Sequence, residues 1–181
     1  PSNPSEQDRT DFGSEVSFVG THEKDRADSL IYLAQQGVPV RVWGNGWTAY
    51  KDQVPGLLIE GRPAYDDEYV KVICCSEINL CFLRKENRDL QTCRSIEIPA
   101  CGGFMLHERN AEMSAIFKED SEAAYFTSDQ DLLEQCKKWL MDSTARGEVA
   151  KNGLGKVTKG TFSHDDRLRE ILDATSQVGN Q

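Results

Sequence analysis

Positive charge gathers in the segment 84–94 of a chain that is otherwise acidic. The whole chain has a formal net charge of -9. The segment holds four cations (Arg84, Lys85, Arg88 and Arg94) against two acids, a local charge of +2. Guanidinium groups bind phosphate oxygens through paired hydrogen bonds. The segment is therefore a candidate site for a diphosphate, and an ordinary solvated loop is the alternative.

A carboxylate follows the last of these arginines at helical spacing. Arg94 and Glu97 are three residues apart, which places them on one face of a helix. A surface salt bridge between them would contribute only ~0.5 kcal/mol, too little to account for the arrangement. A carboxylate beside a diphosphate could instead accept hydrogen bonds from the two hydroxyls of a ribose. Thr92 precedes the pair, and Pro99 predicts that the helix is short or kinked.

Two glycine-containing turns are further candidates for ligand binding. Gly20 and Thr21 follow an apolar run and precede a helix that contains Arg26. Backbone N–H groups at a helix start attract anions, and a glycine lets a phosphate approach; a plain structural turn is equally compatible. The second turn, Trp43–Trp47, includes Gly44. Its tryptophans could pack over the sheet edge, or the loop could shape the mouth of a ligand crevice.

Short apolar runs alternate with helical stretches along the chain. The sequence predicts strands at 15–20, 38–44, 57–60, 78–83, 104–106 and 122–126. It predicts helices at 25–36, 66–75, 92–101, 111–117, 129–141, 144–158 and 165–175. Strands separated by helices favour βαβ units with right-handed crossovers. The expected fold class is α/β: a Rossmann-like, doubly wound, mainly parallel six-stranded sheet with helices on both faces.

The length of 181 residues suits one domain. The polar, Pro- and Ser-rich start predicts a flexible leader over 1–14, followed by the domain at 15–175 and a flexible tail at 176–181. Ser128 with Asp131 predicts the N-terminal cap of the helix 129–141, and Ser163 that of the helix 165–175.

Composition argues against several partners. An acidic chain lacks the clustered cations that nucleic acid binding requires. No apolar run approaches the ~20 residues of a membrane span. The six cysteines form no C-x-x-C pair of a zinc site, and we interpret them as buried free thiols in a reducing cytoplasm. No histidine can be placed beside a cysteine from the sequence, so no catalytic thiol is assigned.

The run R-S-I-E-I-P-A-C-G-G-F-M-L, preceded by F-V-G-T and V-W-G-N-G-W, resembles the nucleotide-sugar-binding half of GT-B glycosyltransferases. It is most similar to the CgeB-like (spore-maturation-type) branch of the group 1 enzymes. The resemblance covers about residues 16–172, and R-x-x-E-x-P-A-C-G-G is its more specific part. It implies that the domain is a single GT-B half, the C-terminal one.

The resemblance also implies roles for individual residues. Glu97 would bind the nucleotide ribose, and Arg94 would clamp the diphosphate. Asp89 stands where larger relatives carry a glutamate near the donor sugar, and is the candidate catalytic residue. The loop from Arg62 to Tyr65 would lie near the base. The expected donor-binding residues are Gly20, Thr21, Arg26, Gly44, Arg62, Tyr65, Arg84, Lys85, Thr92, Arg94 and Glu97.

The resulting hypothesis is a donor-binding domain of a glycosyltransferase that transfers a sugar from a nucleoside diphosphate sugar. No metal or other cofactor is expected, because the cationic loop could take the place of Mg²⁺. The resemblance covers one of two halves, so the partner would be an acceptor-binding domain or chain. A non-catalytic nucleotide-binding or protein-interaction module on the same fold is the alternative. A phospho-acceptor receiver is disfavoured, because no acidic pair follows the first strand. Base, sugar, acceptor, stereochemical outcome and oligomeric state remain open.

Overall fold

Six parallel strands form the centre of the structure, a computed structural model that describes residues 3–178. The strands are β1 (Ser14–Val19), β2 (Val40–Trp43), β3 (Leu57–Ile59), β4 (Ser76–Cys81), β5 (Met105–Glu108) and β6 (Ala124–Phe126). Their order in the sheet is β3-β2-β1-β4-β5-β6, and each neighbouring pair is parallel. The predicted doubly wound α/β fold is confirmed. The strand order reverses between β1 and β4, where such sheets open a crevice at the carboxyl ends of their strands.

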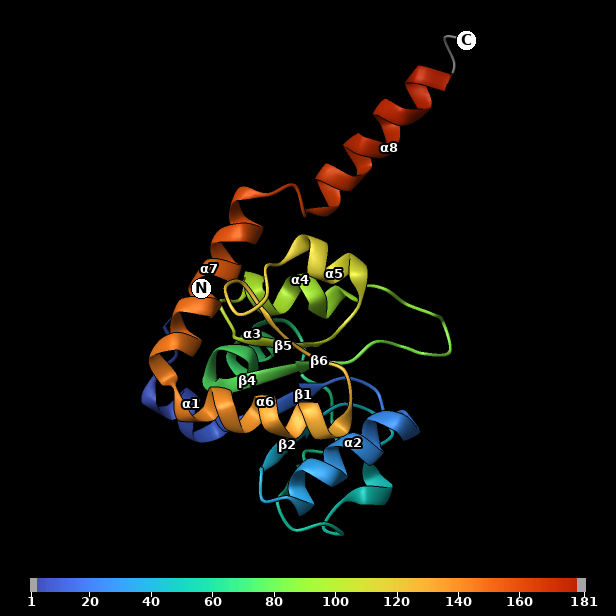
Figure 1. Ribbon diagram of the computed structural model, residues 1–181. Helices are drawn as coiled ribbons and strands as arrows, with labels where there is room; N and C mark the ends of the chain where they lie inside the picture. The colour runs from blue at the N-terminus through green and yellow to red at the C-terminus, as the bar shows by residue number, and fades with distance from the viewer. Residues whose placement is uncertain (1–2, 179–181) are drawn as a thin grey trace.

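Helices cover both faces of this sheet (Figure 1). On one face lie α2 (Lys24–Gln35) and α6 (Asp129–Met141), whose Leu30 and Leu132 are fully buried. On the other lie α3 (Asp66–Cys75), α4 (Cys93–Ala100) and α5 (Ala111–Ile116), which bury Ile73, Ile98 and Met113. Alternate strand residues point to the two layers, so the sheet contributes to two separate apolar cores.

Local sequence explains where several of these elements begin and end. The Ser128 Oγ accepts the N–H of Asp131 at 3.2 Å and caps α6, as predicted. The predicted bounds of α3 and α6 are those of the structure. Helix α4 is only eight residues long and contains Pro99, which has no N–H to give to the preceding turn. A short turn of helix, η1 (Thr48–Tyr50), precedes β3.

The prediction of a flexible leader over 1–14 is wrong from Glu6 onward. Residues Glu6–Phe12 form a helix, α1, and β1 starts at Ser14. At its start the Ser5 N–H donates to the Asp8 carboxylate at 3.0 Å, and the Asp8 N–H donates to the Ser5 Oγ at 3.1 Å. The Phe12 ring lies 5.9 Å from that of Trp43. This cap and this aromatic anchor outweigh the polar composition from which flexibility was inferred. Residues 1–2 lie outside the described part of the chain.

The anchor can be tested by removing the Phe12 ring. Phe12→Ala should lower the free energy of unfolding by about 2 kcal/mol, because a partly buried aromatic contact with Trp43 is lost. Urea denaturation measures the change. Gln7→Ala, on the exposed side of the same helix, is the control and should change it by less than about 0.5 kcal/mol. Equal effects of the two substitutions would mean that α1 is not anchored through Phe12.

Two helices end the described chain. Helix α7 (Ser143–Lys159) packs on α4 and α6, whereas α8 (His164–Val178) projects away from the body (Figure 1). The Ser163 Oγ accepts the N–H of Asp166 at 3.1 Å, which confirms the predicted cap. The predicted flexible tail at 176–181 begins too early, since α8 continues to Val178; residues 179–181 lie outside the described part. The projecting helix exposes an apolar stripe of Leu168, Ile171 and Leu172, each more than half exposed.

Candidate functional site

Two adjoining cavities open beyond the carboxyl ends of the strands around the reversal between β1 and β4. The wide cavity has a volume of about 740 Å³ and the narrow cavity about 330 Å³. Thr21, Arg94 and Glu97 line both, so these residues form the boundary between them. Parallel sheets of this order bind ligands at this place.

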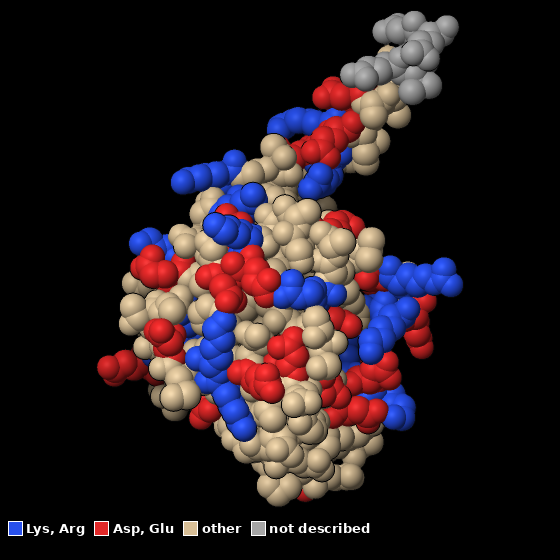
Figure 2. Space-filling view, in the orientation of Figure 1, with Lys and Arg blue, Asp and Glu red and all other residues tan. Residues whose placement is uncertain are grey.

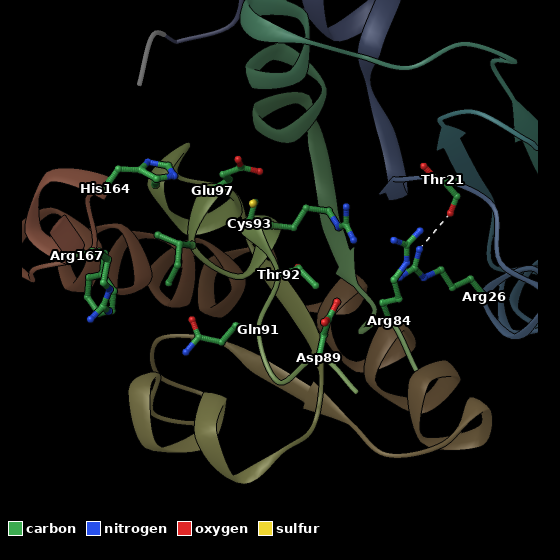
Figure 3. Close-up of a pocket in the computed structure, with 14 residues that line it drawn as sticks. Thr21, Arg26, Arg84, Asp89, Gln91, Thr92, Cys93, Glu97, His164 and Arg167 are labelled. Atoms are coloured by element: carbon green, nitrogen blue, oxygen red, sulfur yellow. Dashed lines mark hydrogen bonds between the residues drawn. The ribbon is translucent and has the colours of Figure 1, made fainter. Parts of the chain in front are cut away.

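The wide cavity is built from four segments of the chain (Figure 3). They are the turn after β1, the start of α2, the loop after β4 with helix α4, and the connection between α7 and α8 with the first turn of α8. Figure 3 shows His164 and Arg167 at the opposite end of the cavity from Thr21 and Arg26. The complete lining is Thr21, Arg26, Arg84, Asp89, Gln91, Thr92, Cys93, Arg94, Ile96, Glu97, Ala100, Phe162, His164 and Arg167.

The turns after β1 and β2 form one wall of the narrow cavity and are tied together. The Gly20 N–H donates to the Trp43 carbonyl at 2.8 Å, and the Trp47 Nε1 donates to the Gly20 carbonyl at 2.8 Å. Both tryptophans are almost fully buried, as the packing hypothesis expected. Gly44 also lines the narrow cavity, so the loop that these tryptophans anchor does shape a crevice.

Three arginines, Arg26, Arg84 and Arg94, line the wide cavity, and Arg94 also lines the narrow one. The guanidinium carbons of Arg26 and Arg94 each lie 5.7 Å from the centre of the Phe18 ring. Glu23 is shared between two of the three, at 2.7 Å from Arg84 and 3.3 Å from Arg26. Figure 2 shows cationic side chains among acidic ones over the edge of the molecule where the loop after β4 lies. Glu23 and the boundary residue Glu97 are two carboxylates against three guanidinium groups, which leaves a net positive charge here.

Arg26 is part of the folded frame of this site. It is only 4 % exposed, and it donates to the carbonyls of Thr21 at 3.1 Å and Leu83 at 3.3 Å. Burial lowers the pKa of Arg26, and the charges of Arg94 and Arg84 lower it further, against the opposing effect of Glu23. Arg26 thus joins the turn after β1 to the end of β4 while it keeps a positive charge near the cavity.

Arg94 and Glu97 are not paired with each other. Within residues 3–178 neither side chain has an ion-pair partner, and the Arg94 Nε is buried without a hydrogen bond. A Cβ added to Gly20 would lie 3.4 Å from the Arg94 Nη1, so the glycine turn passes directly beside this guanidinium. A positive and a negative group, both unpaired and facing the same cavities, are available to a ligand.

Two polar atoms of the narrow cavity also lack partners. The Trp43 Nε1 and the Tyr69 hydroxyl are buried without a hydrogen bond in the described part of the chain. Burial, together with the nearby Glu97 carboxylate, raises the pKa of Tyr69, so its hydroxyl keeps its proton. Buried donors are almost always paired in folded proteins. These two therefore mark the narrow cavity as a place where water or a ligand completes the hydrogen bonding.

The structure brings most of the predicted site residues together. Asp89, Thr92 and Arg84 line the wide cavity, and Gly20, Gly44 and Tyr65 line the narrow one. Arg62 and Lys85 do not line either. Arg62 forms a two-pronged ion pair with Glu68 at 2.6 and 2.7 Å and stacks on Trp43. Lys85 pairs with Asp25 at 3.1 Å and lines a separate cavity of about 80 Å³. Both cations form ion pairs with neighbouring acids in this arrangement, and their assignment to the site stays a prediction.

Sequence reasoning missed other lining residues. Tyr69 lies one turn into the predicted helix 66–75, directly after the loop assigned to the site, and Cys93 lies between two assigned residues. Their positions in the sequence were a usable signal. Phe162, His164 and Arg167 carried none, because the path of the chain after α7 brings them to the cavity.

Within the described residues, no group of three or more His, Cys, Asp or Glu side chains is placed to hold a metal ion. In that same part of the chain, no helix has the length and apolar character needed to cross a membrane.

A family model described as glycosyl transferase-like matches residues 22–173. The chain belongs to this glycosyl transferase-like family. The matched span includes the loop after β4, helix α4 and the connection to α8, which together form most of the wide cavity. No curated protein sequence matches the chain.

Solved structures show the same fold at low sequence identity. The C-terminal domain of the group 1 glycosyl transferase LpcC from Francisella tularensis is 15% identical with a TM-score of 0.69; the match covers 88% of this chain and 93% of that domain. Sucrose-phosphate synthase from Thermosynechococcus elongatus is 13% identical with a TM-score of 0.72, over 98% of this chain and 50% of that one. HepE from Anabaena, in complex with UDP and glucose, is 12% identical with a TM-score of 0.72, over 96% and 53%.

These matches identify the fold as that of one half of a GT-B glycosyltransferase. The chain spans about half the length of the synthase and of HepE, but nearly all of the LpcC domain.

Proposed function

We propose that the chain is the donor-binding domain of a glycosyltransferase and binds a nucleoside diphosphate sugar, as a member of the CgeB-like branch. The observation that carries the proposal is Arg94, which lies at the boundary of two cavities with no ion-pair partner within residues 3–178. A charge left unpaired in a folded site is costly unless a ligand uses it. A diphosphate supplies the oxygens that a guanidinium binds most strongly.

The two cavities suit the two ends of such a ligand. The diphosphate would lie at the boundary, against Arg94 and the N–H groups of the turn at Gly20 and Thr21. Glu97, on the same helix face, would accept hydrogen bonds from the ribose. The nucleoside would occupy the narrow cavity, whose free donors can serve a base, and the sugar would extend into the wide cavity toward Asp89.

The chemistry expected of this arrangement is electrostatic. When the bond from the sugar to the diphosphate breaks, negative charge builds up on the leaving diphosphate. Arg94 and Arg84 would stabilise that charge more in the transition state than in the ground state, which lowers the barrier. In this proposal the arginines do what a bound Mg²⁺ does elsewhere, so donor binding needs no metal ion.

Related folds support a nucleotide as ligand. The HepE structure is described in complex with UDP and glucose, and a TarM structure is described in complex with UDP. Their low identity leaves the base and the sugar of this chain open. Uridine diphosphate is therefore the first nucleotide to test.

Transfer also requires an acceptor site, for which we propose a second domain or a partner chain. The chain covers about half of several structural neighbours, and the apolar stripe of α8 is available for a contact. The six free thiols support a cytoplasmic location. A non-catalytic nucleotide-binding or protein-interaction module on the same fold is the second candidate.

Ligand-dependent stability tests the proposal. Purified protein is titrated with UDP, GDP, UDP-glucose and inorganic pyrophosphate, with either EDTA or MgCl₂ present, while Tm is followed. A nucleotide at 100 times its Kd should add about 2.7 kcal/mol to the free energy of unfolding. We expect at least one nucleotide to raise Tm equally with EDTA and with MgCl₂. No shift with any nucleotide would contradict donor binding, and a shift only with MgCl₂ would contradict the metal-independent site.

A further inference from the structure

A buried polar cluster lies beneath the wall that the two cavities share. It consists of Cys81, Ser95 and His107, and none of the three has measurable exposure. Cys81 on β4 and His107 on β5 are paired in the register of the sheet, and Ser95 reaches them from the first turn of α4. Thiol, hydroxyl and imidazole groups this deep in a core are kept only when their hydrogen bonds are satisfied.

Ser95 connects this helix turn to the sheet. Its Oγ lies 2.9 Å from the His107 Nε2 and accepts the Thr92 N–H at 3.1 Å. On its other side, the His107 Nδ1 donates to the Glu108 carbonyl at 2.6 Å. A neutral ring therefore carries its proton on Nδ1, and its Nε2 accepts the proton of the Ser95 hydroxyl.

Cys81 allows the protons of the cluster to be distributed among the three side chains in a second way. Its Sγ lies 3.7 Å from the Ser95 Oγ and 3.6 Å from the Thr92 Oγ1. If the thiol proton moves to the His107 Nε2, that nitrogen donates to Ser95, whose hydroxyl turns to donate to the thiolate. Each group keeps a partner in both arrangements, and the net charge of the pair is the same.

Helix α4 depends on the hydrogen bonds of Ser95 to the sheet because the helix is weakly stable by itself. It has eight residues, and Pro99 cannot donate the helical hydrogen bond to the Ser95 carbonyl. Arg94 directly precedes Ser95, and Glu97 follows within the same turn. A shift of this turn would therefore carry both groups away from the boundary between the cavities.

We propose that Cys81, Ser95 and His107 are positioning residues that hold Arg94 and Glu97 at the cavity boundary, and that their protons make anion affinity fall as pH rises through neutrality. The inference rests on the proposed function, because it assigns a regulator to the same site.

The direction of the pH effect follows from charge. Burial alone would raise the pKa of the Cys81 thiol, but His107, Arg94 and Thr92 outweigh it and lower that pKa to about 7. Burial alone would lower the pKa of His107, but Cys81 and the Glu108 carbonyl raise it above its ordinary value. Each proton lost as pH rises removes positive charge from below Arg94, so anion binding weakens whichever group loses its proton first.

The other groups that face His107 do not reverse this sign. The Tyr125 ring on β6 lies 6.2 Å away, and burial raises the pKa of its hydroxyl to about 12, so it stays neutral. The Glu108 carboxylate accepts the Leu83 N–H at 3.0 Å and belongs to the adjacent end of β5. Thr92 and Ser95 on α4 carry no charge.

The test compares Ser95→Ala and His107→Gln with the matched control Ser17→Ala. Ser17 is also a buried serine on this sheet, and its hydroxyl donates to Asn79 at 2.9 Å away from the cavities. For each protein we would measure Kd for UDP and for inorganic pyrophosphate between pH 6.5 and 8.5, Tm, and amide hydrogen exchange over residues 92–97. The ionisation of each ligand at a given pH is the same for every variant, so differences between variants report the protein.

We expect Ser95→Ala to weaken both ligands about tenfold and to speed exchange over residues 92–97, as for loss of a partner that orients a ligand-binding group. His107→Gln keeps an acceptor for the Ser95 hydroxyl but cannot titrate. It should therefore bind nearly as well as the wild type near pH 7 but with a flatter pH dependence. Ser17→Ala should lower Tm but leave the two Kd values and the exchange over residues 92–97 unchanged.

Three results would overturn parts of the inference. If Ser95→Ala and Ser17→Ala affect affinity and exchange alike, the cluster does not position α4. If His107→Gln keeps the wild-type pH slope, the protons of the cluster do not control affinity. If the wild type binds neither probe, the proposed function fails, whereas the exchange data still decide whether Ser95 holds the helix turn.

Discussion

Replacing Arg94 by alanine should weaken UDP binding by about a hundredfold and leave the free energy of unfolding nearly unchanged. Arg94 has no ion-pair partner within residues 3–178, so little folding energy is lost with its side chain. A guanidinium that binds a diphosphate through two charge-assisted hydrogen bonds contributes about 3 kcal/mol, which corresponds to about a hundredfold in Kd. Isothermal titration calorimetry measures the affinity, and urea denaturation measures the stability.

Two further variants distinguish a specific role of Arg94 from an effect of net charge. Arg109→Ala is the control: Arg109 also lies at the carboxyl edge of the sheet, but it pairs with Glu119, stacks over Tyr125 at 5.2 Å and lines neither cavity. It should bind UDP like the wild type. Arg94→Lys keeps the charge without the planar fork and should fall between the wild type and alanine. Equal losses in Arg94→Ala and Arg109→Ala would reduce the effect to net charge and remove the specific role of Arg94.

Gly44→Ala should destabilise the protein by about 3 kcal/mol and abolish binding in the narrow cavity. A Cβ at this position would lie 1.9 Å from the Gly20 carbonyl oxygen, and the backbone φ of +155° is one that other residues rarely adopt. The contact is with backbone, so it can be relieved only by moving the turn after β1, which lines the same cavity. Overpacking of this kind and the strained backbone together give the expected magnitude.

Gly37→Ala separates the effect of backbone strain from the effect of the steric contact. Gly37 has a φ of +83°, but a Cβ there would meet nothing within 4 Å. It should cost about 1 kcal/mol from backbone strain alone and leave UDP binding intact. Urea denaturation and UDP titration are measured on both variants. Similar losses of stability for Gly37→Ala and Gly44→Ala would show that the close approach of the two turns is not important.

The fold could be predicted because the sequence signals that specify it are local and recur along the chain. Apolar runs alternating with amphipathic helices give a parallel sheet, and the caps at Ser128 and Ser163 mark the starts of two helices. Helix α1 was not predicted: its cap of Ser5 and Asp8 is a local signal that the polar composition masked, and its anchor is the contact of Phe12 with Trp43. Composition could not indicate a contact between residues that far apart in the sequence.

The grouping of residues around the candidate cavities could be predicted where it depends on strand ends, and not where it depends on pairing between side chains. Thr21 follows the end of β1, Arg94 and Glu97 lie in the helix after β4, and the topology brings them together. Arg62 and Lys85 also follow strand ends in the sequence, but each forms an ion pair with an acid on a neighbouring helix. The proximity of Cys81 and His107 depends on the register of β4 against β5, which composition and spacing do not specify.

The order of the strands has a consequence for how the domain holds together. Strands β1, β2 and β3 come from the first part of the chain and form one half of the sheet, and β4, β5 and β6 form the other. The seam is closed by the pairing of β1 with β4 and by α2 against α6, where Ser29 donates to Asp129 at 2.6 Å. A ligand held between the turn at Gly20 and the helix at Arg94 would join the two halves of the sheet at a further point. Binding would then make two halves behave as one cooperative unit, and ligand release would be the first step in loosening them.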